Sequence, residues 1–146
     1  MMQDDKNKIR EQLLDTLYHG LQDEMNAAYQ YIALAGKYGN AEIKQAFLHY
    51  AQDELRHAAK LMGIIGDLGE PVQHIPVVQD DQEDLYLYLI EYMANEESAI
   101  FYYEALESLV QQPELQLLCR EMRGEEQMHL RQMRALYQQV KNSEKQ

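Results

Sequence analysis

The chain has 146 residues, 46% of them hydrophobic, and it carries 25 acidic against 13 basic side chains for a net charge of −12. This length predicts one ordinary domain over residues 1–146. The acidic balance argues against nucleic acid and anionic membranes as partners, because both repel a negative protein. The one cysteine, Cys119, excludes an internal disulfide and a cysteine-rich zinc or iron–sulfur site.

The first residues are polar and acidic, and no apolar run approaches the ~20 residues of a membrane span. We therefore expect no signal peptide and no membrane segment. The expected location is the cytoplasm.

Four long segments of helix-forming residues are separated by clusters of glycine and proline. They predict helices over residues 5–36, 40–67, 82–111 and 114–142. The first and third connections are short, which predicts antiparallel hairpins. The segment around residues 69–81 is longer and holds two prolines and several branched residues, which favours an extended strap along the bundle. The predicted fold class is an all-α, antiparallel four-helix bundle with a long crossover between the second and third helices.

Each predicted helix carries an apolar stripe at spacings of three and four residues, typical of a face that packs in a core. The third stripe, for example, includes Leu85, Tyr92, Ile100 and Tyr103. At mid-stripe the four helices contribute acidic and imidazole side chains: Glu24; Glu54 and His57; Glu96; Glu126 and His129. Burying a carboxylate costs several kcal/mol without a cation or hydrogen bonds. The stripes hold no lysine or arginine at this level, so two divalent metal ions are predicted to balance the four carboxylates.

An internal repeat supports this prediction. The pattern Glu24-x6-Tyr31, then Asp53-Glu54-x2-His57, recurs after a constant offset of 72 residues as Glu96-x6-Tyr103, then Glu125-Glu126-x2-His129. A single Glu-x-x-His in a Glu-rich helical chain is usually a solvent-exposed face. Two such motifs, both inside apolar stripes and equivalent in a repeat, indicate a dimetal site, since positions i and i+3 share one helix face. The repeat also selects Glu96 over its neighbour Glu97 and predicts a pseudo-twofold axis.

Asp53 and Glu125 each precede a predicted ligand. Because metal-bound histidines usually donate their second ring N–H to a carboxylate, we expect Asp53 to orient His129 and Glu125 to orient His57. The alternative for both acids is ordinary surface charge.

Tyr31 and Tyr103 lie two helical turns from Glu24 and Glu96. Their hydroxyls are expected to bond the glutamate of the opposite half, or else to be core tyrosines with other partners. The remaining histidines lack the upstream glutamate and are expected to be ordinary: His19, His49 and His74.

This repeated pattern resembles the ferritin-like di-iron carboxylate superfamily and is most similar to rubrerythrins and bacterioferritins. The resemblance implies two iron ions (Fe2+/Fe3+) as cofactors and oxidation of ferrous iron by dioxygen or peroxide. It also implies roles for the six ligands: Glu24 and Glu96 would be terminal, Glu54 and Glu126 would bridge the irons, and His57 and His129 would cap them.

The sequence also departs from those families. It has no paired cysteines of a rubredoxin-like iron domain. Ala99 stands where rubrerythrins carry an additional glutamate, which argues against their peroxidase cycle. Leu55 stands where bacterioferritins carry a haem-ligating methionine, so no haem is expected. Only a short polar segment follows the fourth predicted helix, which favours a homodimer over a closed cage.

Three functions therefore stay open, beside the remaining option of a metal-free structural bundle. The first is an oxidoreductase, a ferroxidase or peroxide scavenger that uses an unidentified electron donor. The second is a non-catalytic iron carrier or reservoir. The third is a dimanganese, catalase-like protein, because carboxylate-rich sites also suit manganese.

Overall fold

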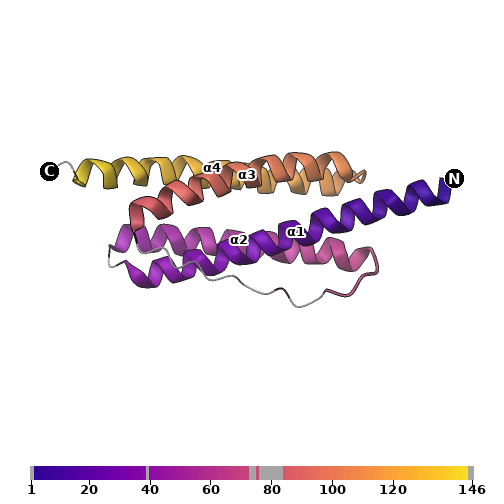
Figure 1. Ribbon diagram of the computed structural model, residues 1–146, viewed down its shortest axis with the longest axis horizontal. Coiled ribbons are helices and arrows are strands. Elements are labelled where there is room, and N and C mark those ends of the chain that lie inside the picture. The colour runs from indigo at the N-terminus through magenta and orange to yellow at the C-terminus, as the bar shows by residue number, and fades with distance from the viewer. Residues whose placement is uncertain (1, 39, 73–74, 76–83, 145–146) are drawn as a thin grey trace. The chain divides into compact units, whose positions relative to one another are not determined.

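The computed structural model describes residues 2–38, 40–72, 75 and 84–144. Within these ranges it contains four α-helices and no strand (Figure 1). The helices are α1 (Met2–Lys37), α2 (Ala41–Asp67), α3 (Leu85–Leu109) and α4 (Pro113–Glu144). All four predicted helices are thus confirmed, with ends that differ by three residues or fewer. Residues 82–83 of the third prediction, and the strap residues 73–74 and 76–81, lie outside the described residues.

The chain divides into two compact units, Met1–Gln79 and Asp80–Gln146, and each contains one helical hairpin. The expectation of a single domain over residues 1–146 stays a prediction. No described helix is both long and apolar enough to cross a membrane.

In the first hairpin, α1 and α2 lie side by side and antiparallel (Figure 1). Asn40 caps α2, because its side-chain oxygen accepts hydrogen bonds from the backbone N–H groups of Glu42 (2.9 Å) and Ile43 (3.2 Å). Near the other end, Arg10 of α1 donates to the Leu68 carbonyl at 2.7 Å. The Asn40 cap thus fixes where α2 begins, and Arg10 links α1 to the residue that follows α2.

The end of α2 is a Schellman motif. Gly69 has a φ of 81°, and its N–H bonds the Gly66 carbonyl at 2.9 Å, while the N–H of Glu70 bonds the Ile65 carbonyl at 3.4 Å. A positive φ is easily adopted only by glycine, so Gly69 determines where α2 stops.

The interior of the first hairpin is aromatic beside its polar centre. The Tyr31 ring lies 6.0 Å from the Phe47 ring and 5.5 Å from the Tyr50 ring, measured between centroids. All three side chains are almost completely buried. Such contacts fix the register of α1 against α2, because large rings pack in few arrangements.

In the second hairpin, contacts near both ends show that α3 and α4 are antiparallel. The hydroxyls of Tyr86 and Tyr137 are 2.7 Å apart. Toward the other end, Glu107 accepts from Arg120 at 2.6 Å and from Arg123 at 3.4 Å. Asp84 caps α3 by accepting from the N–H of Tyr86 at 2.8 Å.

The predicted core faces are largely confirmed. Buried side chains on every helix follow the apolar stripes, and Tyr92 and Tyr103 of the third stripe are among them. Leu85 and Ile100 are exceptions, since both are only partly buried. Leu85 is the first residue of α3, at the end of the helix, and Ile100 lies toward the margin of the stripe, where a three- and four-residue spacing does not distinguish the core from its edge.

Candidate metal centre

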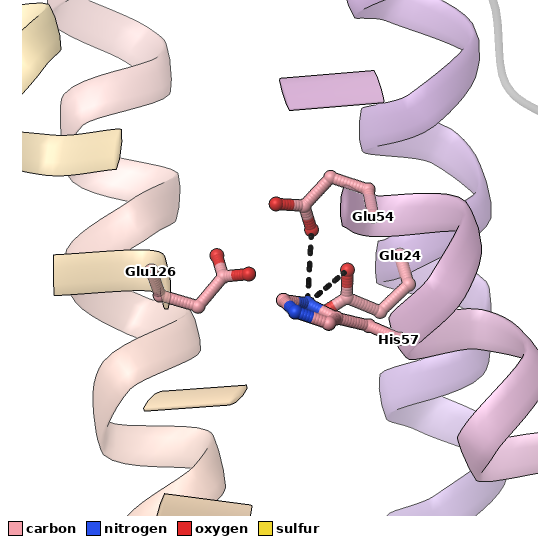
Figure 2. A group of neighbouring side chains, drawn as sticks. All are labelled: Glu24, Glu54, His57 and Glu126. Carbon is pink, nitrogen blue, oxygen red and sulfur yellow. Dashed lines mark ion pairs between the residues drawn. The ribbon is translucent and has the colours of Figure 1, made fainter. Parts of the chain in front are cut away.

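The first hairpin brings Glu24 of α1 together with Glu54 and His57 of α2. Figure 2 shows the three side chains turned toward one another. The Nδ1 atom of His57 lies 3.6 Å from a Glu24 carboxylate oxygen and 3.8 Å from a Glu54 oxygen. Their exposed fractions are 4% for Glu24, 2% for Glu54 and 0% for His57. This group is called the first triad.

The second hairpin repeats the arrangement with Glu96 of α3 and Glu126 and His129 of α4. The Nδ1 atom of His129 lies 3.6 Å from a Glu96 oxygen. All three side chains are buried, with at most 3% of their surface exposed. This second triad occupies the positions that the 72-residue repeat predicts.

Both triads have donor atoms suited to a metal ion. In each, one ligand atom of every residue lies within 4.8 Å of one from each of the others. Two ligands held about 2.1 Å from a shared cation, with about 90 to 120° between them, are themselves about 3.0 to 3.6 Å apart. The distances from His Nδ1 to the carboxylates approach this range. They are longer than a good hydrogen bond, so they fit shared coordination better than direct pairing.

Burial makes the charge of these carboxylates costly. Within the described part of the chain, no lysine or arginine is buried. Divalent cations would neutralise the glutamates, and neutral imidazoles would add nitrogen ligands without changing the charge balance. The donor set of each triad, two carboxylates and one imidazole, therefore fits iron or manganese.

The second predicted group, Asp53 and Glu125, lies at the margin of the buried region. Asp53 is 15% exposed at its side chain and accepts a hydrogen bond from Arg56 at 2.9 Å. His49 lies 3.5 Å from its other oxygen. Glu125 is partly buried. That these acids orient the histidines of the opposite half stays a prediction.

Sequence reasoning missed the contacts of Asp53 with Arg56 and His49. Their spacing of three and four residues on α2 was the available signal. Exposed histidines and arginines are common on helices, so this spacing does not by itself predict a contact. The Nδ1 atoms of His57 and His129 lie toward the glutamates of their triads, so a carboxylate that orients either ring would have to approach Nε2.

The two predicted tyrosines are buried. Tyr31 and Tyr103 both have 0% exposure. Tyr31 packs against Phe47 and Tyr50, and the ring of Tyr103 lies edge-on to Tyr102 at 5.1 Å. Their expected bonds to the glutamates of the opposite half stay predictions.

Comparison with known proteins defines the family. The rubrerythrin family model matches residues 15–137. The chain belongs to the rubrerythrin family. The match includes both triads of this rubrerythrin-family protein, and it confirms the resemblance that the repeated motifs indicated. No curated protein sequence matches the chain.

Solved structures show the fold of this rubrerythrin-family protein to be the ferritin-like four-helix bundle, which confirms the predicted fold class. The chain is similar to a ferritin-like diiron-carboxylate protein from Bacillus anthracis, with 24% identity, a TM-score of 0.80, and coverage of 87% of this chain and 96% of that one. A hypothetical protein from Pyrococcus furiosus has 26% identity, a TM-score of 0.79, and coverages of 89% and 90%. The Desulfovibrio desulfuricans bacterioferritin has 21% identity, a TM-score of 0.77, and coverages of 92% and 83%.

Proposed function

We propose that this protein binds two iron ions through the two triads and oxidises ferrous iron with dioxygen or peroxide. One observation carries the proposal: a rubrerythrin-family chain has two buried triads, each of two glutamates and one histidine, at equivalent positions of its repeat. Four carboxylates balance two divalent ions, so the bound centre would be neutral in an apolar interior.

The ligand roles follow from the position of each residue. Glu54 and Glu126, three residues before the histidines on the same helices, would each hold an ion together with the histidine of their own triad, and the bridging role that the resemblance implies for them stays a prediction. Glu24 and Glu96 each come from the other helix of their hairpin and are proposed to be terminal ligands. His57 and His129 are proposed to bind through Nδ1, the atom that faces the carboxylates at 3.6–3.8 Å.

When bound, two ferrous ions would supply two electrons, which together with two protons reduce dioxygen to hydrogen peroxide, or hydrogen peroxide to two water molecules. The protein holds the carboxylates and imidazoles in place and keeps water out with buried side chains such as Tyr31, Tyr50 and Met122. Asp53 and Glu125 are proposed to hold the outer N–H of the histidines. Repeated turnover would require an electron donor. The cytoplasmic location expected from the sequence stays a prediction.

The similar solved structures favour iron over manganese as the bound metal. The Bacillus anthracis protein is a diiron-carboxylate protein, and the Desulfovibrio desulfuricans bacterioferritin has a diiron site. The ligand chemistry itself suits either metal.

The test is anaerobic loading with ferrous iron, followed by dioxygen or peroxide. We expect two ferrous ions to bind per chain. Oxidant should then produce new near-ultraviolet absorption at least tenfold faster than with iron free in the same buffer. The double variant Glu54→Ala/Glu126→Ala should lose both. Glu97→Ala is the matched control, because Glu97 is the exposed neighbour of Glu96 and pairs with Arg134.

Three results would contradict the proposal, and each would support a different interpretation of the triads. Tight binding of two ions with oxidation no faster than free iron would identify a carrier or reservoir. Manganese rather than iron in protein purified from its own host would identify a dimanganese protein. Unchanged metal content in Glu54→Ala/Glu126→Ala would mean that the triads are not the site.

We further propose a homodimer. On α1, Met25, Tyr29 and Ile32 share one face, because they are spaced by four and three residues. On α2, Leu48 and Leu55 are two turns apart. Tyr29, Ile32, Leu48 and Leu55 are 38–48% exposed. Uncharged, apolar stripes of this kind are typical of interface cores, and two copies that each carry −12 would repel each other less there than at a charged surface.

A further inference from the structure

An open surface cavity of about 380 Å³ lies on the second hairpin, and the proposed function does not use it. Its lining consists of one residue from α3 and four from α4: Ile100, Gln127, Leu130, Arg131 and Arg134. None of these is a proposed metal ligand. The cavity therefore needs an explanation of its own.

The polar side chains of the lining are all N–H donors. Gln127, Arg131 and Arg134 are spaced by four and three residues, so they project from one face of α4. Among the described residues no acidic side chain lines the cavity, although acidic side chains outnumber basic ones 25 to 13 in the chain. In this acidic protein, two arginines and a glutamine thus line one concave surface.

The charge of the two arginines is only partly balanced. Arg134 pairs with Glu97 at 3.1 Å, but both side chains are more than half exposed, and such pairs contribute little. Arg131 has no ion pair within the described part of the chain. Like charges on adjacent helical turns repel each other, so an anion between them would relieve this repulsion.

The floor of the cavity is apolar. Leu130 is 7% exposed, and Ile100 is partly buried. Gln127, Arg131 and Arg134 are exposed, so their N–H groups can reach an anion that lies on this apolar surface. The guanidinium fork also matches the geometry of a carboxylate or a phosphate, which it binds with two parallel hydrogen bonds.

We propose that this cavity binds a small oxyanion, with Arg131 and Arg134 holding its charged oxygens and Gln127 donating a further hydrogen bond. The headgroup is a carboxylate or a phosphate, and a short hydrocarbon part would lie on Leu130 and Ile100. The site is separate from the proposed iron chemistry, and it would exist whichever metal the triads bind.

The experiment uses the full-length, metal-free protein, because phosphate also binds iron. The side-chain Nε–H signals of arginine are followed by NMR while inorganic phosphate, or in a second series succinate, replaces chloride at constant ionic strength. We expect saturable shifts of the Arg131 and Arg134 signals. The anion that saturates at lower concentration identifies the headgroup.

Arg131→Gln/Arg134→Gln should bind at least tenfold more weakly, and Gln127→Ala should bind several-fold more weakly. Arg120→Gln is the matched control, since Arg120 lies on the same helix outside the cavity and pairs with Glu107. It should bind as the unaltered protein does. Shifts that never saturate with either anion, that spread equally over all arginines, or that survive in Arg131→Gln/Arg134→Gln would overturn the proposal.

Discussion

Glu54 occupies a position on α2 where an ordinary helical hairpin would carry a leucine. It is 2% exposed, and it shares the first triad with a second carboxylate, Glu24. In the metal-free protein, Glu54→Leu should therefore raise the free energy of unfolding by about 1 to 3 kcal/mol. The substitution removes a buried charge, and His57 still has Glu24 as a partner. Guanidinium unfolding in the presence of a chelator measures this.

The same variant should no longer be stabilised by added ferrous or manganous ions, whereas the unaltered protein gains stability through metal binding. Glu97→Leu, on the exposed face of α3, should change neither quantity by more than about 0.5 kcal/mol. Metal-free Glu54→Leu that is less stable than the unaltered protein would show that the carboxylate has a structural role instead.

Cys119 is fully buried, and its thiol should be unreactive in the native protein. Burial, helped by the negative charge of Glu107 and opposed by Arg123, raises the pKa of the Cys119 thiol to about 11. Only about one thiol in a thousand would be ionised at pH 8. A disulfide reagent should therefore react with it only after unfolding, and a fast native reaction would contradict this burial.

The raised pKa of Cys119 also has a pH dependence of defined sign. Between pH 9 and pH 11 the unfolded thiol loses its proton while the folded thiol keeps it, so stability falls as the pH rises through this window. The loss should reach about 2 kcal/mol near pH 11. Cys119→Ala should lack this part of the alkaline decline, and parallel pH curves for the two proteins would contradict the prediction.

The six triad residues could be predicted from the sequence because each is an anomaly in an apolar stripe and recurs after 72 residues. Other features could not. The contacts of Asp53 with Arg56 and His49 involve residues that are unremarkable one by one. The cavity beside Arg131 and Arg134 depends on how α3 packs against α4, and Ile100, which the sequence assigns to the core, lines that open surface.

At the level of the helices, Gly69 sets the end of α2. Its φ of 81° strains any other residue, although no atom lies within 4 Å of where a Cβ would be. Gly69→Ala should therefore lower the free energy of unfolding by about 1 kcal/mol through conformational strain alone.

Gly63→Ala provides the opposite control. Gly63 lies inside α2, is exposed and also has open space around it. Alanine should stabilise the helix there by about 0.5 to 1 kcal/mol. Urea unfolding of the two variants should thus give effects of opposite sign, and a shared sign would mean that the Schellman motif does not determine the helix end.

Helix ends were predictable to within a few residues because glycine, proline and capping residues mark them. Asn40 and Gly69 are examples at the two ends of α2. The first helix nevertheless begins at Met2, ahead of the predicted start, and Asp4 and Asp5 in its first turn favour this because acidic side chains interact well with the positive end of the helix dipole.

For the whole molecule, the proposed dimer gives the sharpest prediction. One chain has a mass of 17.2 kDa, so sedimentation equilibrium should give about twice that value. Ile32→Lys should shift the mass toward the monomer, because it places a charge within the apolar stripe of α1. Ile9→Lys, an exposed apolar position on the same helix outside that stripe, should leave it unchanged. A monomeric unaltered protein would contradict the dimer.

The aromatic composition has an optical consequence. The chain contains 11 tyrosines and no tryptophan, and Tyr31 and Tyr50 are buried beside the first triad. Its intrinsic fluorescence therefore comes from tyrosine alone, because no tryptophan is present to accept energy from the tyrosines or to mask their emission. A metal ion that absorbs in the near ultraviolet and lies near these rings would quench that light, so the protein can report the filling of its own centre without any attached label.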